Sequence, residues 1–337
     1  MSFVKSWAVR SVVIAVLIVG GAACSTPSTP TPPPPPPPPP AAPPTLACVE
    51  GISRATVNAG GTAVNFDAPP VTGGQGSVTT TCSPESGSTF PIGTTSVTCK
   101  GTDTLNRTGE CSFDVTVSKL ATLSKTKYLA FGDSITAGEI TFPISSTSSG
   151  MALISKQVVV PSAAYPTLLL KTLQGRYSSQ ADAIIVANYG LGGEKTINAR
   201  DRFFAALNTV RPEVVLLWHG HNDIPGGLDG AASSAASEMR IMAAEARLRG
   251  MRVFIATMLP PRPGGNRTIA QVFIDDYNNR MKALAASEGA VLVDIYAALL
   301  PEVNRWIGVD GLHPNEAGYT KIADVFFQAI QANFEVR

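Results

Sequence analysis

The pattern of apolar and polar positions changes character along the chain. In residues 46–118 apolar and polar side chains alternate with a period of two, most clearly from Cys111 to Val117, and Gly, Pro, Asn and Asp separate the runs. This alternation predicts short strands with one buried face. We therefore expect a small all-β sandwich, with a hairpin around the turn at residues 103–109.

From Tyr128 onward, near-continuous apolar runs of strand length alternate with segments of helical length. Strands that are apolar at every position are typical of a parallel sheet with helices on both faces. The pattern predicts an α/β domain over residues 128–337. Its strands are expected at 128–133, 182–188, 213–219, 251–257 and 290–295, and its helices around 163–175, 195–209, 231–249, 268–288 and 315–331.

Two segments fit neither pattern. Residues 119–127 are short and polar and predict a linker between the two domains. Residues 139–161 interrupt the strand–helix alternation, so they predict an insertion.

The first 24 residues have the features of an export signal. Lys5 and Arg10 precede an apolar stretch of 13 residues, 11–23, which is shorter than the roughly 20 residues of a membrane span. Small residues directly before Cys24 resemble a bacterial lipoprotein signal, although Gly21 stands where that family has Leu or Val. The resemblance implies lipidation of Cys24 and anchoring to a membrane of the cell envelope or surface. The alternative is a plain signal peptide cut near the same alanines.

Residues 25–45 are rich in proline, with nine consecutive prolines at 32–40. Proline fixes φ and lacks the backbone N–H, so this segment predicts a stiff polyproline II spacer. Roughly 20 residues at about 3.1 Å each would extend some 60 Å.

Composition narrows the classes of function. The net charge is +1 and the chain has no basic run, so a nucleic-acid partner is not expected. The five cysteines all fall in the first third of the chain, which predicts an oxidised, exported module followed by a thiol-free domain.

The stretch from Cys82 to Cys99, followed by Cys111-Ser112-Phe113, resembles the hyalin-repeat family of immunoglobulin-like extracellular modules. Spacing alone leaves all three pairings of Cys48, Cys82, Cys99 and Cys111 open. The resemblance favours the pairs Cys48–Cys99 and Cys82–Cys111.

A candidate nucleophile follows the first strand of the α/β domain. The apolar run 128–131 breaks at Gly132-Asp133, and Ser134 comes next. The carboxyl end of such a strand borders the crevice where ligands bind, and a strand-to-helix turn exposes N–H groups that can hold negative charge.

Glycines follow the second strand, at positions 190, 192 and 193. Glycine lets the backbone approach a ligand closely and direct N–H groups toward it. The spacing is not that of a dinucleotide-binding fingerprint, so no nucleotide cofactor is expected.

The third strand is followed by His219-Gly220-His221-Asn222-Asp223. The Asn222 carboxamide is a neutral donor suited to a developing oxyanion. The same residues resemble the start of a two-zinc hydrolase motif, but Ile224 stands where that motif needs a further histidine, so no metal is expected. We expect His219 and His221 to shape the pocket wall or to pack.

The last candidate group, Asp310 to Pro314, lies just before the terminal helix. An aspartate three residues before a histidine can accept its Nδ1–H, which leaves Nε2 free to take a proton from serine. The alternative is a helix-capping aspartate beside an incidental histidine.

Together these groups resemble the SGNH (GDSL) hydrolase superfamily. The matching blocks are Gly132 to Gly138; Gly193, with Gly192 as the alternative; Gly220 to Asp223; and Asp310 to Pro314. The resemblance implies a flavodoxin-like three-layer α/β/α fold and a serine ester hydrolase that needs no cofactor. We therefore expect a catalytic triad of Ser134, His313 and Asp310 and an oxyanion hole of Ser134, Gly193 and Asn222. Asp133 and His221 are candidate pocket residues.

The expected activity is hydrolysis of a short acyl ester, such as an acetylated carbohydrate of an extracellular polysaccharide. This substrate class is suggested by export together with an immunoglobulin-like accessory module. A lipid or lysophospholipid esterase and a non-catalytic glycan-binding adhesion protein are the alternatives.

Overall fold

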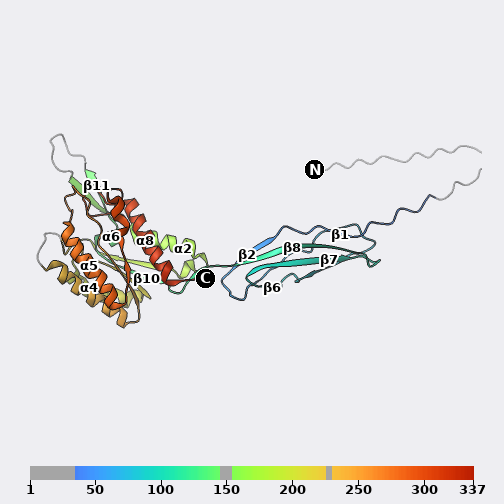
Figure 1. Cartoon of the computed structure of the whole chain (residues 1–337), viewed down its shortest axis with the longest axis horizontal. Coiled ribbons are helices and arrows are strands. Elements are labelled where there is room, and N and C mark those ends of the chain that lie inside the picture. The colour runs from blue at the N-terminus through green and yellow to red at the C-terminus, as the bar shows by residue number, and fades with distance from the viewer. Residues whose placement is uncertain (1–34, 145–153, 225–229) are drawn as a thin grey trace, which may run out of the picture.

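The computed structural model describes residues 35–144, 154–224 and 230–337. The predicted signal peptide, Cys24 and the first part of the proline-rich linker lie outside the described residues. Among the described helices, none combines the length and the hydropathy needed to cross a membrane. Figure 1 shows a strand-rich N-terminal part and an α/β C-terminal part.

The N-terminal part is all-β, as predicted. Its main sheet has the order β2-β8-β7-β5, and two short pairs, β1-β4 and β3-β6, flank it. The strands are β1 (Thr45–Leu46), β2 (Ile52–Thr56), β3 (Thr62–Ala63), β4 (Val71–Thr72), β5 (Thr79–Ser83), β6 (Thr89–Phe90), β7 (Gly93–Thr102) and β8 (Thr108–Lys119). Alternate residues of β7 and β8 are buried, among them Val97, Val115 and Val117. The period-two pattern therefore arises because one face of the sheet packs into the core.

The predicted hairpin joins β7 and β8. The Asp103 carboxylate accepts hydrogen bonds from the backbone N–H groups of Leu105 and Arg107 and from the Arg107 guanidinium. These bonds, with that of Gln75 N–H, lower the pKa of Asp103 to about 2 despite the opposing effect of desolvation.

The disulfide pairing favoured by the resemblance is wrong. The bonds are Cys48–Cys111 and Cys82–Cys99, instead of Cys48–Cys99 and Cys82–Cys111. Strand β7 lies between β5 and β8, so Cys82 and Cys111 are two strands apart, about 9–10 Å, which is beyond the reach of a disulfide. Cys82 lies directly opposite Cys99 in the β5–β7 ladder, with 4.0 Å between their Cα atoms.

The C-terminal part is built on a five-stranded parallel sheet of order β13-β10-β14-β15-β16. The strands are β10 (Lys127–Gly132), β13 (Ile185–Gly190), β14 (Val214–Trp218), β15 (Arg252–Ala256) and β16 (Val291–Val293). The large helices are α2 (Tyr165–Arg176), α3 (Thr196–Val210), α4 (Ala231–Leu248), α5 (Gln271–Glu288) and α8 (Glu316–Phe334). All five predicted strands and all five predicted helices are present, with shifts of a few residues at their ends.

Helices cover both faces of this sheet. Tyr128, Leu216 and Trp218 share a buried cluster with residues of α2 and α8, while Leu129 and Leu217 share another with residues of α3, α4 and α5. Figure 1 shows α4 and α5 on the side of the sheet opposite α8. Because successive side chains of a strand enter opposite cores, every position of β14 is apolar and buried. The predicted three-layer α/β/α architecture is confirmed.

The predicted insertion forms an antiparallel hairpin. Its strands are β11 (Glu139–Ile144) and β12 (Ile154–Val159), and the hairpin follows the short helix α1 (Ser134–Ala137). The remaining elements between the predicted ones are η1 (Ser178–Ala183), α6 (Ile295–Leu299), η2 (Leu300–Glu302) and α7 (Val303–Trp306). These are too short to leave a periodic signal in the sequence.

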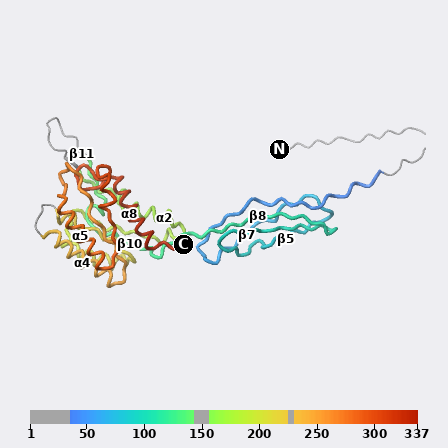
Figure 2. The backbone as a smooth tube through the Cα atoms, in the orientation of Figure 1, coloured from blue at the N-terminus to red at the C-terminus, as the bar shows by residue number. Residues whose placement is uncertain are grey.

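The segment predicted as a linker contains β9 (Thr122–Leu123), which pairs antiparallel with the C-terminal strand β17 (Glu335–Val336). Figure 2 shows the C-terminus at the junction between the two parts of the chain. The first and last segments of the α/β domain therefore lie side by side.

The corrected disulfides can be tested by removing each pair. Loop-closure entropy predicts a loss of roughly 4 kcal/mol for Cys48→Ala/Cys111→Ala, whose cysteines are 63 residues apart, and roughly 3 kcal/mol for Cys82→Ala/Cys99→Ala, which are 17 apart. The measurements are non-reducing peptide mapping and urea unfolding of the N-terminal part within the full chain. Peptides joined as Cys82–Cys111 would contradict the strand order.

Candidate active site

Ser134 stands at the carboxyl end of β10 and begins α1. The chain passes from β10 to β13 on one side and then to β14 on the other, so β10 lies at the point where the strand order reverses. Ligands of open α/β sheets bind outside this point. The last residue of β10 must be glycine, because a Cβ atom at Gly132 would overlap the Trp218 carbonyl oxygen and the Thr136 side chain.

The structure brings Ser134, His313 and Asp310 together, although 179 residues separate the first two. Ser134 Oγ lies 2.9 Å from His313 Nε2, and His313 Nδ1 lies 2.6 Å from Asp310 Oδ2. All three side chains are buried. With Nδ1–H donated to Asp310, Nε2 carries the lone pair that can accept the serine proton.

The loop that carries His313 is held by its own backbone. Asp310 Oδ1 accepts the N–H groups of Leu312 and His313, and the His313 carbonyl accepts the N–H of Gly308. Burial opposes ionisation of Asp310, but the hydrogen bond and charge of His313 and these N–H groups outweigh it and lower its pKa. Asp310 is therefore an ionised acceptor for the imidazole across the neutral range.

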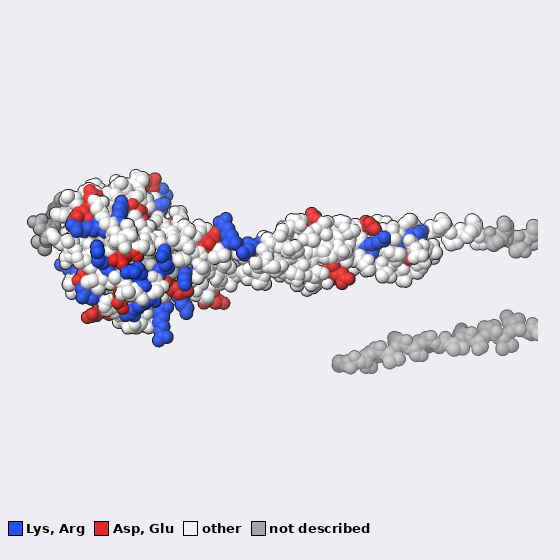
Figure 3. Space-filling view, turned by 60° about the horizontal axis from the view of Figure 1, so that its bottom comes forward, with Lys and Arg blue, Asp and Glu red and all other residues white. Residues whose placement is uncertain are grey.

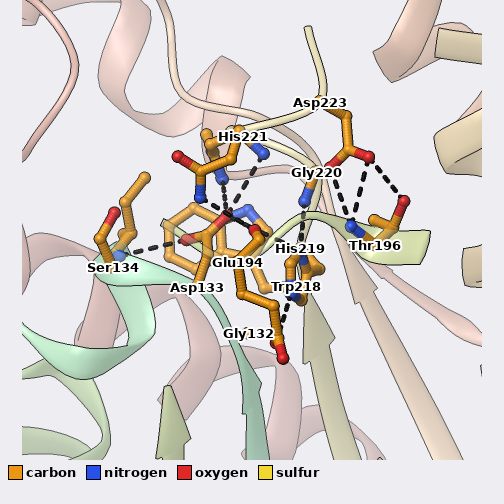
Figure 4. Close-up of polar contacts among 12 residues, drawn as sticks. Gly132, Asp133, Ser134, Glu194, Thr196, Trp218, His219, Gly220, His221 and Asp223 are labelled. Carbon is orange, nitrogen blue, oxygen red and sulfur yellow. Dashed lines mark hydrogen bonds and ion pairs between the residues drawn. The ribbon is translucent and has the colours of Figure 1, made fainter. Parts of the chain in front are cut away.

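A second acid–imidazole pair, Asp133 and His221, lies beside the first. Figure 4 shows the Asp133 side chain directed toward the loop after β14. Asp133 Oδ2 accepts both the backbone N–H of His221 and its Nδ1–H, at 3.2 and 3.0 Å, while Oδ1 accepts the N–H of Ile135. Asp133 is fully buried, which disfavours its charge, yet His221, His219 and the Ile135 N–H lower its pKa to about 2. This carboxylate ties the turn that carries Ser134 to the neighbouring loop.

Sequence reasoning missed a third group, centred on Glu194. Its carboxylate pairs with the Arg202 guanidinium and accepts from His219 Nε2 at 3.0 Å. Arg202 also donates to the carbonyl oxygens of Tyr189 and Gly132, at the ends of β13 and β10. Burial alone would raise the pKa of Glu194, but His219 and Arg202 lower it. The group fixes the glycine loop to the sheet, and its only sequence signal is an acid directly after that loop.

The predicted oxyanion donors Gly193 and Asn222 follow β13 and β14, the two strands that neighbour β10. Asn222 donates one amide hydrogen to the Glu194 carbonyl at 3.0 Å, which fixes the carboxamide and leaves its other hydrogen available. Gly193 has φ +74°, a conformation that favours glycine. Within the described residues, no hydrogen bond uses the N–H of Ser134 or of Gly193.

Asp223 joins the loop after β14 to the start of α3. It accepts from the Thr196 N–H and hydroxyl at the start of α3, as Figure 4 shows. Burial raises the pKa of Asp223. His219 and His221, expected to shape the pocket wall or to pack, hydrogen-bond Glu194 and Asp133, and Asp223 likewise bonds a neighbouring loop through Thr196.

Two further observations describe the surroundings of the site. Among residues 35–144, 154–224 and 230–337, no group of three or more His, Cys, Asp or Glu side chains is arranged to hold a metal ion. The carboxylate of Glu139, the first residue of the inserted hairpin, lies 3.6 Å from His313 Nε2, and the sequence had not singled it out.

The chain is similar to several known proteins. TesA, an esterase of Pseudomonas aeruginosa, is 27% identical over 154 residues, which cover 45% of this chain and 72% of TesA. The crystal structure of a lipase/acylhydrolase from Enterococcus faecalis superposes with a TM-score of 0.49 at 20% identity, over 62% of this chain and 97% of that one. Axe2, an acetylxylan esterase from Geobacillus stearothermophilus, superposes with a TM-score of 0.47 at 20% identity, over 62% and 95%.

Family comparisons cover most of both parts of the chain. Residues 41–117 match the HYR domain, which includes the disulfide-bonded sandwich. Residues 130–321 match the GDSL-like lipase/acylhydrolase family, and this match spans more than half of the chain and contains Ser134, Asn222 and His313. The chain therefore belongs to the GDSL-like lipase/acylhydrolase family, with an N-terminal HYR domain.

Proposed function

We propose that the protein is an exported serine esterase in which Ser134 is the nucleophile, His313 the general base and acid, and Asp310 the residue that orients His313. The observation that carries this proposal is the buried, continuous chain of hydrogen bonds from Ser134 Oγ through His313 to Asp310. In this geometry one imidazole can take the serine proton on one nitrogen while a carboxylate holds the other.

The reaction follows from these contacts. Ser134 Oγ attacks the ester carbonyl carbon as its proton passes to His313 Nε2. The tetrahedral intermediate then breaks its bond to the alcohol oxygen, which takes that proton from Nε2 and leaves. Water repeats the two steps on the acyl-enzyme, releasing the acid and restoring the serine. Asp310 stabilises the imidazolium that forms in each step.

The oxyanion of both intermediates is assigned to three donors: the N–H groups of Ser134 and Gly193 and the Asn222 side chain. The two N–H groups have no partner within the described residues, and Asn222 is oriented by Glu194. Donors fixed before the reaction stabilise developing charge without reorganising during it. Asp133 and His221 are positioning residues, since they join the serine turn to the loop that carries Asn222.

The substrate is proposed to be a short acyl ester of an extracellular carbohydrate. Export, the lipid anchor at Cys24 and the polyproline spacer remain predictions from sequence; the disulfides and the HYR match support an extracytoplasmic environment for the module. Figure 3 shows acidic and basic side chains interspersed over the α/β part. A purely adhesive role is disfavoured because nothing in such a role requires the serine–histidine–aspartate contacts.

The nucleophile can be tested with a fluorophosphonate probe on the full mature chain. We expect the wild type to be labelled and Ser134→Ala to be unlabelled and inactive toward p-nitrophenyl acetate, because the attacking oxygen is lost. Ser237→Ala, on the exposed surface of α4, is the matched control and should be labelled like the wild type. Labelling of a folded Ser134→Ala variant would overturn the assignment.

Asn222→Ala should lower kcat by about 10²–10³, with a smaller change in KM, because it removes a donor that acts on the transition state. Steady-state kinetics on p-nitrophenyl acetate and circular dichroism together test this. A folded variant with a kcat near that of the wild type would remove Asn222 from the oxyanion hole.

Asp133→Asn should destabilise the α/β domain in a pH-dependent way. A folded-state pKa of about 2, against an ordinary value of 3.8, corresponds to about 2 kcal/mol. Because the pKa is lowered on folding, this contribution is present above the unfolded value and is lost as the pH falls toward 2. The difference in unfolding free energy between wild type and variant should therefore narrow below about pH 5. A constant difference from pH 7 to pH 3 would contradict it.

A further inference from the structure

Glu139 is held firmly beside the catalytic groups by its backbone. It directly follows Gly138, whose φ of +91° ends α1, and it pairs with Val159 at the open end of the hairpin. Its carbonyl oxygen accepts the buried Tyr319 hydroxyl at 2.7 Å. These backbone contacts therefore fix the position of the Glu139 Cα atom, and they do not depend on any interaction of its carboxylate.

The carboxylate itself is mostly buried but keeps some contact with solvent. The side chain is 15% exposed, Oε2 lies 3.6 Å from His313 Nε2, and Oε1 lies where a Cβ atom of Gly192 would be. Within the described part of the chain, no N–H or O–H group donates a hydrogen bond to it. Asp133, Asp310 and Glu194 each accept several.

Neither carboxylate oxygen is among the fully buried atoms that lack a partner, so a substrate can reach this carboxylate and no protein donor competes for it. The position of the Glu139 carboxylate relative to His313 shows which part of an ester substrate would donate a hydrogen bond to it. Nε2 must reach the alcohol oxygen in order to protonate it as it leaves. Since Glu139 lies beside the same nitrogen, its nearest substrate neighbour is the leaving alcohol.

We infer that Glu139 is a specificity-determining residue that accepts a hydrogen bond from a hydroxyl on the carbon next to the esterified one. In a carbohydrate or other polyol such a hydroxyl lies within hydrogen-bond distance of the ester oxygen, so it can reach Glu139 while the ester oxygen faces His313. A simple alcohol offers no donor there, and an anionic leaving group is repelled. This inference rests on the proposed esterase activity and names its leaving group.

Three acetate esters that differ only near the leaving oxygen test the inference. They are 2-hydroxyethyl acetate, which can donate to Glu139, 2-methoxyethyl acetate, which keeps the oxygen but cannot donate, and propyl acetate. For the wild type we expect kcat/KM to be about 10- to 100-fold higher for the hydroxy ester than for the other two, as for one hydrogen bond to a charged group.

Glu139→Leu should remove this preference by lowering kcat/KM for the hydroxy ester alone. Glu139→Gln keeps an oxygen acceptor without the charge and should retain an intermediate preference. Glu302→Gln, at an exposed acid whose carboxylate pairs with Arg305, is the control and should behave as the wild type.

The outcomes separate the two proposals. If folded wild-type protein hydrolyses none of the esters and resists the fluorophosphonate, the esterase proposal fails and the inference fails with it. If the wild type hydrolyses all three equally, only the inference is overturned. It is also overturned if Glu139→Leu lowers kcat/KM equally for all three esters and displaces the pH profile, because Glu139 would then act through the charge of His313.

Discussion

The hydrogen bond between Ser134 and His313 depends on the packing of the whole α/β domain, because it joins the first strand of the sheet to the loop before the last helix. The two segments are far apart in the sequence, so local structure alone cannot bring Ser134 and His313 together. Aromatic packing does so: Tyr165 of α2 stacks on Phe326 of α8 at 4.9 Å and meets Trp218 of β14 edge-on at 5.6 Å. These rings fix the last helix against the sheet, and the site forms where the helix begins.

The sequence alone predicts those parts of this arrangement that depend on hydrophobic periodicity or on local motifs. Strands buried on both faces, such as β14, leave an unbroken apolar run, and the turns that carry Ser134, Asn222 and His313 are short patterns with recognisable spacing. All of them follow or precede long regular elements, so their meeting at one edge of the sheet could be expected from topology alone.

What the sequence could not provide depends on which strands are neighbours and on single long-range contacts. The correct disulfides required the order β5-β7-β8, and spacing leaves that order open. Glu194 and Glu139 are isolated acids whose importance comes from Arg202, His219 and His313, which are distant in the chain or approach only after folding. Residues 139–161 interrupt the strand–helix alternation and so indicate an insertion, but the pairing of β11 with β12 has too few periodic positions to predict.

The pairing of β9 with β17 bears on how the HYR domain is mechanically coupled to the α/β domain. Tension transmitted from the HYR domain enters the α/β domain at residues 122–124, before it reaches the strand that carries Ser134. There the Gln180 side chain hydrogen-bonds both the backbone N–H and the backbone carbonyl of Leu123, and the Ser124 N–H donates to the Phe334 carbonyl. These contacts link the segment before β10 to α8 and η1, so a force applied through the HYR domain would reach that helix and η1 as well as the strand that precedes Ser134.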